Sequence, residues 1–109
     1  MNTKIIINCT PHDVMVYNDE GRLINIFPKS DDPIRLSSTT LRMGDINGIP
    51  LSQTQFGNPE NMPKVDENTY LIVSKAIKES LPFIDNLIVP NETVRNNKGE
   101  IIGCKSFWL

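Results

Sequence analysis

The chain has 109 residues, 39% of them hydrophobic and 22% charged, which suits one ordinary domain spanning residues 1–109 with a modest core. The 11 Lys and Arg are scattered and the formal net charge is -2, so binding of duplex nucleic acid, which favours a basic excess, is not expected. The longest apolar run near the start, Ile5–Ile7, is too short for a bilayer span or a signal peptide. We therefore expect a cytoplasmic protein without membrane contact.

Residues 4–27 predict three short strands. Residues 4–9 are rich in β-branched side chains, which predicts a buried strand that ends at the Thr10-Pro11 breaker. Residues 13–17 and 22–27 flank a turn in which Gly21 can take a positive φ. This pair predicts a hairpin.

The middle of the chain carries the clearest turn signal. After a polar loop and a short strand at 34–36, Thr39–Ile46 and Ile49–Gln55 flank Asn47-Gly48, the favoured pair for a type I′ turn. Residues 56–68 contain a glycine and two prolines and predict a long surface loop, of a length that is often functional.

The last third predicts two strands, one helix and a hairpin. Residues 69–73 form a β-prone strand, and Ser74 suits the N-cap of a helix over 75–81 that Pro82 stops. Residues 87–89 predict a short strand ended by Pro90, and 93–109 predict a hairpin turning at 97–99. The fold class is α+β: a small strand-rich domain, with antiparallel hairpins forming a sheet or partly open barrel and one short helix.

Four polar clusters are candidates for a ligand site. Thr10 and His12, between the first two strands, suit a phosphate or ribose, or else shape the turn. Thr40 and Arg42 share one face of a predicted strand, as do Thr54 and Phe56 on its partner; this face suits an anionic nucleotide, or is simply solvated.

The other two clusters lie in the last third of the chain. Ser74 stands where helix N–H groups favour an anion, or caps the helix in the ordinary way. Arg95 can fork two hydrogen bonds onto a phosphate, or pairs with a surface glutamate, and Tyr70, like Phe56, could stack on a base.

The two cysteines and the only histidine predict neither a metal site nor a catalytic site. Cys9 and Cys104 lie in apolar strands and are expected to be reduced, buried core thiols. Together with His12 they are too few for a structural zinc site, so no metal is expected. A nucleophile–base pair of Cys9 and His12 lacks an orienting third group, and neither a phosphate loop nor a hydrolase elbow is present, so we expect neither an enzyme nor a cofactor.

An ordered set of short segments resembles small uncharacterised proteins of bacteriophage and prophage genomes that open with an Ile-Asn-x-Thr-Pro-His motif. This opening is Ile7 to His12 here, and the likeness continues through residues 47–50, 54–57, 70–74 and 99–103, nearly the whole chain. Members of that group typically carry Arg-x-Asp after the helix, where this chain has Phe83-Ile84-Asp85, so a basic group is not expected there.

The resemblance implies a host-cytoplasmic phage protein, and such small proteins often counter bacterial immunity. We therefore expect a non-enzymatic sponge that sequesters a small anionic nucleotide-type immune signal, of the cyclic nucleotide or cyclic ADP-ribose class. Because a chain of this size builds only a shallow pocket, we expect a homo-oligomer with the ligand between subunits. The alternative is a protein–protein interaction module, either a direct inhibitor of a host protein or a minor phage structural protein, suggested by the 56–68 loop and the apolar tail Phe107-Trp108-Leu109.

Overall fold

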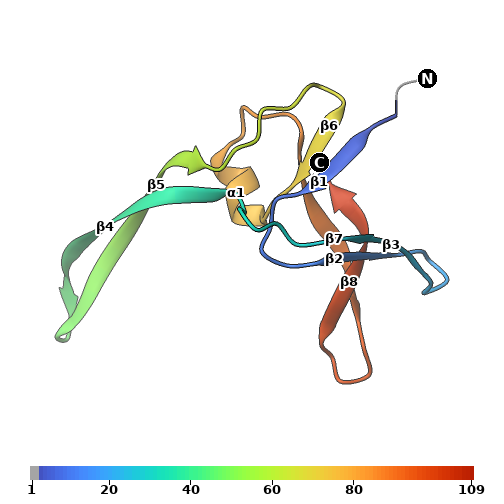
Figure 1. Cartoon of the computed structure of the whole chain (residues 1–109). Helices are drawn as coiled ribbons and strands as arrows, with labels where there is room; N and C mark the ends of the chain where they lie inside the picture. Colours follow the sequence, from blue (N-terminus) through green and yellow to red (C-terminus); the bar gives the residue numbers. More distant parts are fainter. Residues whose placement is uncertain (1–2) are drawn as a thin grey trace.

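The computed structural model describes residues 3–109 and divides them between one curved sheet, one short helix and a projecting hairpin (Figure 1). The six-stranded sheet has the order β1-β6-β7-β8-β2-β3, and β4 pairs only with β5. The elements are β1 (Ile5–Asn8), β2 (Val14–Tyr17), β3 (Leu23–Phe27), β4 (Arg35–Ile46), β5 (Ile49–Glu60), β6 (Thr69–Ile72), α1 (Lys75–Ser80), β7 (Leu87–Arg95) and β8 (Ile101–Trp108).

The structure confirms the α+β class and the three predicted hairpins, β2–β3, β4–β5 and β7–β8. It also contains parallel pairs that the sequence did not predict: β1 with β6, β6 with β7, and β2 with β8. Parallel neighbours are joined by long connections rather than tight turns, so no local turn signal marks them. The sheet is therefore mixed.

Two hydrophobic clusters lie on opposite faces of the central strands β6 and β7. Alternation sends Leu71 and Val73 into the first cluster, which α1 covers through Ile77, and sends Ile72 into the second. Ile6 from one edge strand and Phe27 from the other pack against the second cluster, with the Phe27 and Phe107 ring centroids 6.0 Å apart. Burial on both faces explains the continuous apolar run of β6.

The two edge strands of the sheet meet at one end. The side-chain amide of Asn8, the last residue of β1, donates a hydrogen bond of 2.9 Å to the carbonyl oxygen of Phe27, the last residue of β3. Beside it, the backbone N–H of Ser30 donates to the Thr10 carbonyl oxygen at 2.8 Å and that of Ile34 to the Cys9 carbonyl oxygen at 2.9 Å. These hydrogen bonds connect the end of β1 and the turn after it to β3 and the segment that follows β3.

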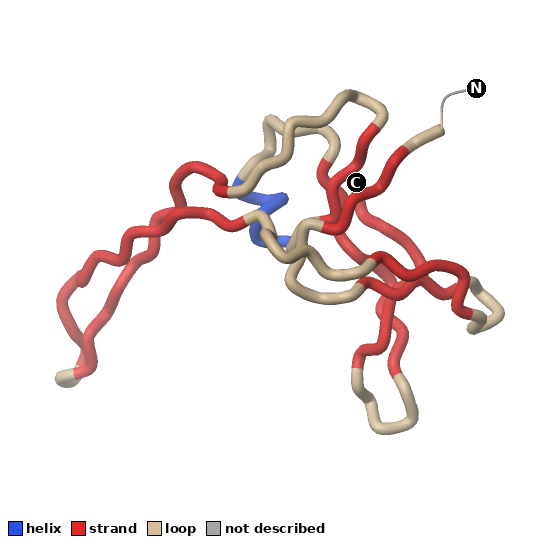
Figure 2. The backbone as a smooth tube through the Cα atoms, viewed as in Figure 1, coloured by secondary structure: helices blue, strands red, loops and turns tan. Residues whose placement is uncertain are grey.

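Strands β4 and β5 form a long arm that leaves the rest of the molecule (Figures 1 and 2). Its turn has the predicted chemistry, with φ of 51° at Asn47 and 82° at Gly48. The arm is longer than expected: β5 runs on to Glu60, so the predicted loop at 56–68 is wrong for its first five residues. We use "the arm" for residues 35–60.

Two further sequence expectations need correction. The first strand was expected to be buried, but β1 is an edge strand and exposes Ile5 and Ile7. Pro90 was expected to end a strand at Val89, but β7 continues to Arg95. Pro90 is tolerated because β6 ends at Ile72, opposite Ile88, so one side of β7 has no strand partner beyond that point and needs no donor there.

No helix among residues 3–109 is long and apolar enough to cross a membrane.

Candidate functional site

The turn between β1 and β2 is organised by one buried side chain, Asn8. Its Nδ2 donates to the carbonyl oxygen of His12 at 2.8 Å as well as to that of Phe27, while its Oδ1 accepts from the Thr10 N–H at 2.9 Å and the Thr10 hydroxyl at 2.7 Å. The amide thus uses both of its donors and its acceptor. This fixes residues 10–13 relative to the edge strands.

This rigid turn forms one wall of a groove of about 720 Å³, which we call the turn groove. The first turn of α1, with Ser74 and Ile77, forms another wall, and β7 and β8 supply the floor through Val89, Thr93 and Gly103. The volume lies within the range of about 300–1,000 Å³ typical of small-molecule sites. The groove is lined by residues 9–15, 34, 73–74, 77, 89–90, 93 and 101–104.

The chemistry of the groove is mostly apolar with a polar rim on the turn side. His12 is exposed, and its ring makes no hydrogen bond within residues 3–109, so the imidazole is free to meet a ligand. The neighbouring Asp13 carboxylate accepts a hydrogen bond of 2.8 Å from the Lys29 N–H. No Lys or Arg lines the groove among the residues that the structure describes. A single chain therefore offers a phosphate one imidazole and no guanidinium.

Both cysteines border the groove from beneath its surface. Cys9 is 5% exposed and Cys104 1%, both are free thiols, and the prediction of buried core cysteines is confirmed. Burial raises the pKa of each thiol above its ordinary value; for Cys104, hydrogen bonds with the Asn91 and Ser106 backbone partly offset that rise. A raised pKa keeps the sulfur protonated at neutral pH, which is unfavourable for a nucleophile.

Of the nine predicted site residues, the structure brings Thr10, His12 and Ser74 together around the groove. Two of these hydroxyls are already used locally. The Thr10 hydroxyl donates to Asn8, and Ser74 Oγ accepts from the Ile77 N–H at 3.3 Å as the N-cap of α1. Thr10 therefore shapes the turn and Ser74 caps the helix, which are the alternatives that the sequence left open for these two residues. His12 is the one of the three whose side chain makes no hydrogen bond within residues 3–109.

Four other predicted residues lie on one face of the arm, as strand alternation indicated. Thr40 pairs with Thr54, their hydroxyl oxygens 3.3 Å apart, and Arg42 pairs with Ser52. Phe56, opposite Ser38, continues the same face and is 57% exposed. Within one chain none of the four lines the turn groove.

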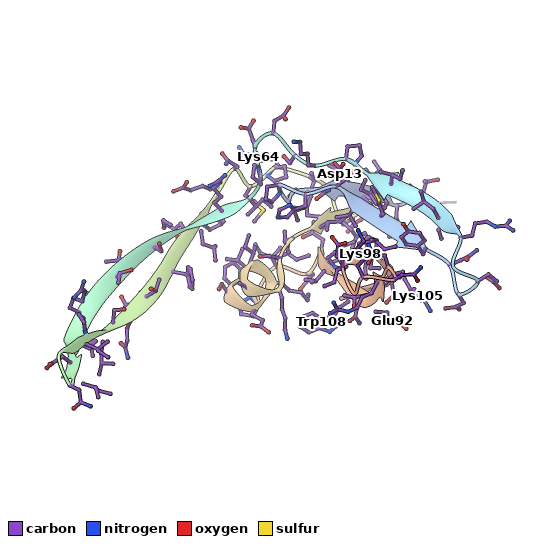
Figure 3. All side chains as sticks on the ribbon, turned by 90° about the horizontal axis from the view of Figure 1, so that it is seen from below. Asp13, Lys64, Glu92, Lys98, Lys105 and Trp108 are labelled. Carbon is purple, nitrogen blue, oxygen red and sulfur yellow. The ribbon has the colours of Figure 1, made fainter. Side chains whose placement is uncertain are left out.

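The last two predicted residues are placed apart from both the groove and the arm. Tyr70 packs on the second cluster with Lys4 Nζ 6.0 Å from its ring centroid. Arg95 lies in the β7–β8 hairpin, and its guanidinium donates to the Gly99 carbonyl oxygen at 2.7 Å. Figure 3 shows how that hairpin, marked by Glu92, Lys98 and Lys105, stands away from the arm.

Several groove residues were missed by the sequence reasoning. The most informative are Gly103, which lines the groove, and Asn8, whose side chain holds the turn that forms one wall of it. Strands β2 and β8 approach so closely that a Cβ at position 103 would lie 2.5 Å from the Met15 carbonyl oxygen. The sequence signal that could have identified Asn8 is its place near the end of a predicted strand, just before the Thr10-Pro11 turn. Asn side chains at such positions often hydrogen-bond the local backbone.

Comparison with known proteins gives no further guide. No protein-family model matches the chain, and neither the curated proteins nor the solved structures contain a significant match to it.

Proposed function

We propose that this chain is a non-enzymatic binding protein that sequesters a small nucleotide-type molecule in the turn groove. The observation that carries the proposal is the groove itself: about 720 Å³ of space between a rigid turn, the start of α1 and the β7–β8 floor. A mostly apolar site with a few converging polar groups is the usual form of a small-molecule pocket.

The composition of the groove constrains how such a ligand would lie. The apolar side chains of Val89, Ile101 and Ile102 suit a planar base, while His12 on the rim suits a ribose hydroxyl or a phosphate. Because the groove has no Lys or Arg, it favours a ligand with one phosphate group near His12 over a polyphosphate.

Two features favour binding without turnover. The thiol closest to His12 in sequence, Cys9, is buried with a raised pKa, so it does not present a thiolate to a bound ligand. The resemblance to phage and prophage proteins is the second feature. For a phage protein that counters host immunity, it is enough to sequester a signal of the cyclic nucleotide or cyclic ADP-ribose class without cleaving it.

The decisive experiment is native mass spectrometry of the protein purified from bacterial cells, followed by calorimetric titration with cyclic mononucleotides, cyclic dinucleotides and cyclic ADP-ribose. We expect one ligand of this class to bind unchanged and to be recovered intact after heat denaturation. His12→Ala should weaken its binding, while Lys98→Ala, an exposed change outside the groove, should not. No binding across the series, or recovery of a hydrolysed product, would reject the proposal.

The arm supports a second function, that of a protein–protein interaction module. It projects from the sheet and exposes several large apolar side chains, as does the chain end, where Leu109 is 65% exposed. Trp108 is half-exposed, and Lys78 Nζ lies 5.3 Å from its ring centroid. Because its ring already contacts Lys78, Trp108 is less available to a protein partner than the sequence suggested. A host protein retained at a fixed stoichiometry by the wild type and lost on removal of residues 38–56 would favour this function.

A further inference from the structure

The arm has two chemically different faces. Opposite residues of an antiparallel pair project to the same side, so the pairs Thr40–Thr54 and Arg42–Ser52 define a polar face. On the other side lie Leu41, opposite Gln53, then Leu51 by alternation and the pair Ile46–Ile49 near the turn, with Met43 at the bulge beside them. We call these five residues the apolar arm face.

No other element among residues 3–109 covers this face. Its side chains are between 40% and 67% exposed, and Figure 3 shows the arm with side chains on both sides and no other element beside it. Within the described part of the chain, the arm packs on the first cluster through Leu36 at its base. A two-stranded hairpin is at best marginally stable in water unless another surface packs on it.

The surface of the chain shows how much a partner would have to cover. Its accessible area is 8043 Å², whereas a compact monomer of this mass exposes about 6,100 Å². The radius of gyration is 17.1 Å against about 13 Å for a compact chain of this length. The excess area of about 1,900 Å² exceeds the roughly 800 Å² that each partner contributes to a standard interface.

We infer that the apolar arm face packs against a second copy of this chain, so that the arm is the assembly element of a homo-oligomer. Charge supports this partner over a strongly acidic or basic one. The arm carries Arg35 and Arg42 against Asp45 and Glu60, a balance of two and two, so copies approach without net repulsion. The inference concerns the arm alone and does not depend on a ligand in the turn groove.

Sedimentation equilibrium across a range of protein concentrations tests the inference directly. The wild type should sediment as a multiple of 12.3 kDa. Leu41→Thr with Leu51→Thr, which keeps the strand propensity of the arm, should raise the dissociation constant about tenfold or more, because the interface loses two leucines per arm. The matched control, Ser52→Thr with Thr54→Ser on the polar face, should assemble like the wild type.

Hydrogen exchange of the wild type provides a second readout that needs no variant. The backbone amides of residues 38–56 should exchange slowly at concentrations where the chain is associated and rapidly on dilution to monomer, while those of β6 and β7 stay protected throughout. A wild type that is monomeric at every concentration overturns the inference, as does assembly unaffected by the leucine changes. If the wild type is a monomer that binds a host protein, and the leucine changes abolish that binding, the arm is a protein–protein interaction module. That result rejects the second copy as its partner.

Discussion

The side-chain amide of Asn8 holds the carbonyl oxygen of His12 at 2.8 Å, across the turn that separates β1 from β2. Because the same amide also donates to Phe27 on β3, the position of His12 in the turn groove is tied to the contact between the two edge strands. One buried residue therefore supports both the fold and the candidate site.

We expect Asn8→Ala to lower the free energy of unfolding by about 2–4 kcal/mol, because it removes four hydrogen bonds and leaves partners in the turn unpaired. Urea denaturation followed by far-ultraviolet circular dichroism measures the loss. Asn8→Asp keeps the acceptor for Thr10 but sets a carboxylate oxygen against the carbonyl oxygens of His12 and Phe27, so it should destabilise the protein at least as much as Asn8→Ala. A loss below about 0.5 kcal/mol for the alanine variant would show that the turn does not depend on this amide.

His12→Ala should affect ligand binding and not stability. The exposed ring makes no hydrogen bond within residues 3–109, so the free energy of unfolding should change by less than about 0.5 kcal/mol. Affinity for a nucleotide-type ligand should fall about tenfold, the loss of one hydrogen bond to a charged group. Arg95→Ala removes another candidate phosphate contact, but outside the groove, and should bind like the wild type. The reverse pattern would move the site to the β7–β8 hairpin.

Gly103→Ala should destabilise the protein by about 1–3 kcal/mol, because the added methyl group overlaps the backbone of β2 and cannot be relieved by a side-chain rotation. It should also change the floor of the turn groove. The thermal midpoint of this variant should be compared with that of Lys105→Ala, an exposed change in the same strand. The difference separates the effect of the close approach between β2 and β8 from the general effect of a substitution in β8. Equal midpoints would contradict the packing of β2 on β8.

The two thiols predict a loss of stability at alkaline pH. Burial raises the pKa of Cys9 and Cys104 above the value of 9.0 that applies when they are exposed. As the pH rises past that value, the unfolded chain releases these protons before the folded chain does, so the stability they contribute is present below pH 9.0 and is lost above it.

Replacing both cysteines by alanine should therefore flatten the decline in unfolding free energy above pH 9.0, while costing about 1–2 kcal/mol per site at neutral pH. Denaturation curves at several pH values measure both effects. Neither thiol should react rapidly with a thiol reagent in the native protein. Fast labelling of Cys9 would instead indicate a reactive sulfur and reopen a catalytic reading of the turn.

Several features of this protein follow from the sequence by itself, because they depend on neighbouring residues. Asn47-Gly48 sets the turn of the arm, and alternation puts Thr40, Arg42, Thr54 and Phe56 on one face of it. Ser74 caps α1 as expected. Turn dihedrals, caps and strand alternation are local preferences, and no distant partner is needed to satisfy them.

Tertiary structure alone decided which segments meet. It made the sheet mixed, let β7 continue through Pro90, and gathered residues 9–15, 73–74, 77 and 101–104 around one groove. It also placed Arg42 and Arg95 away from His12, although each of these three side chains is of a type that can bind a phosphate group. Pairing between distant strands depends on burying apolar area on both faces of β6 and β7, a non-local free energy that no short stretch of sequence encodes.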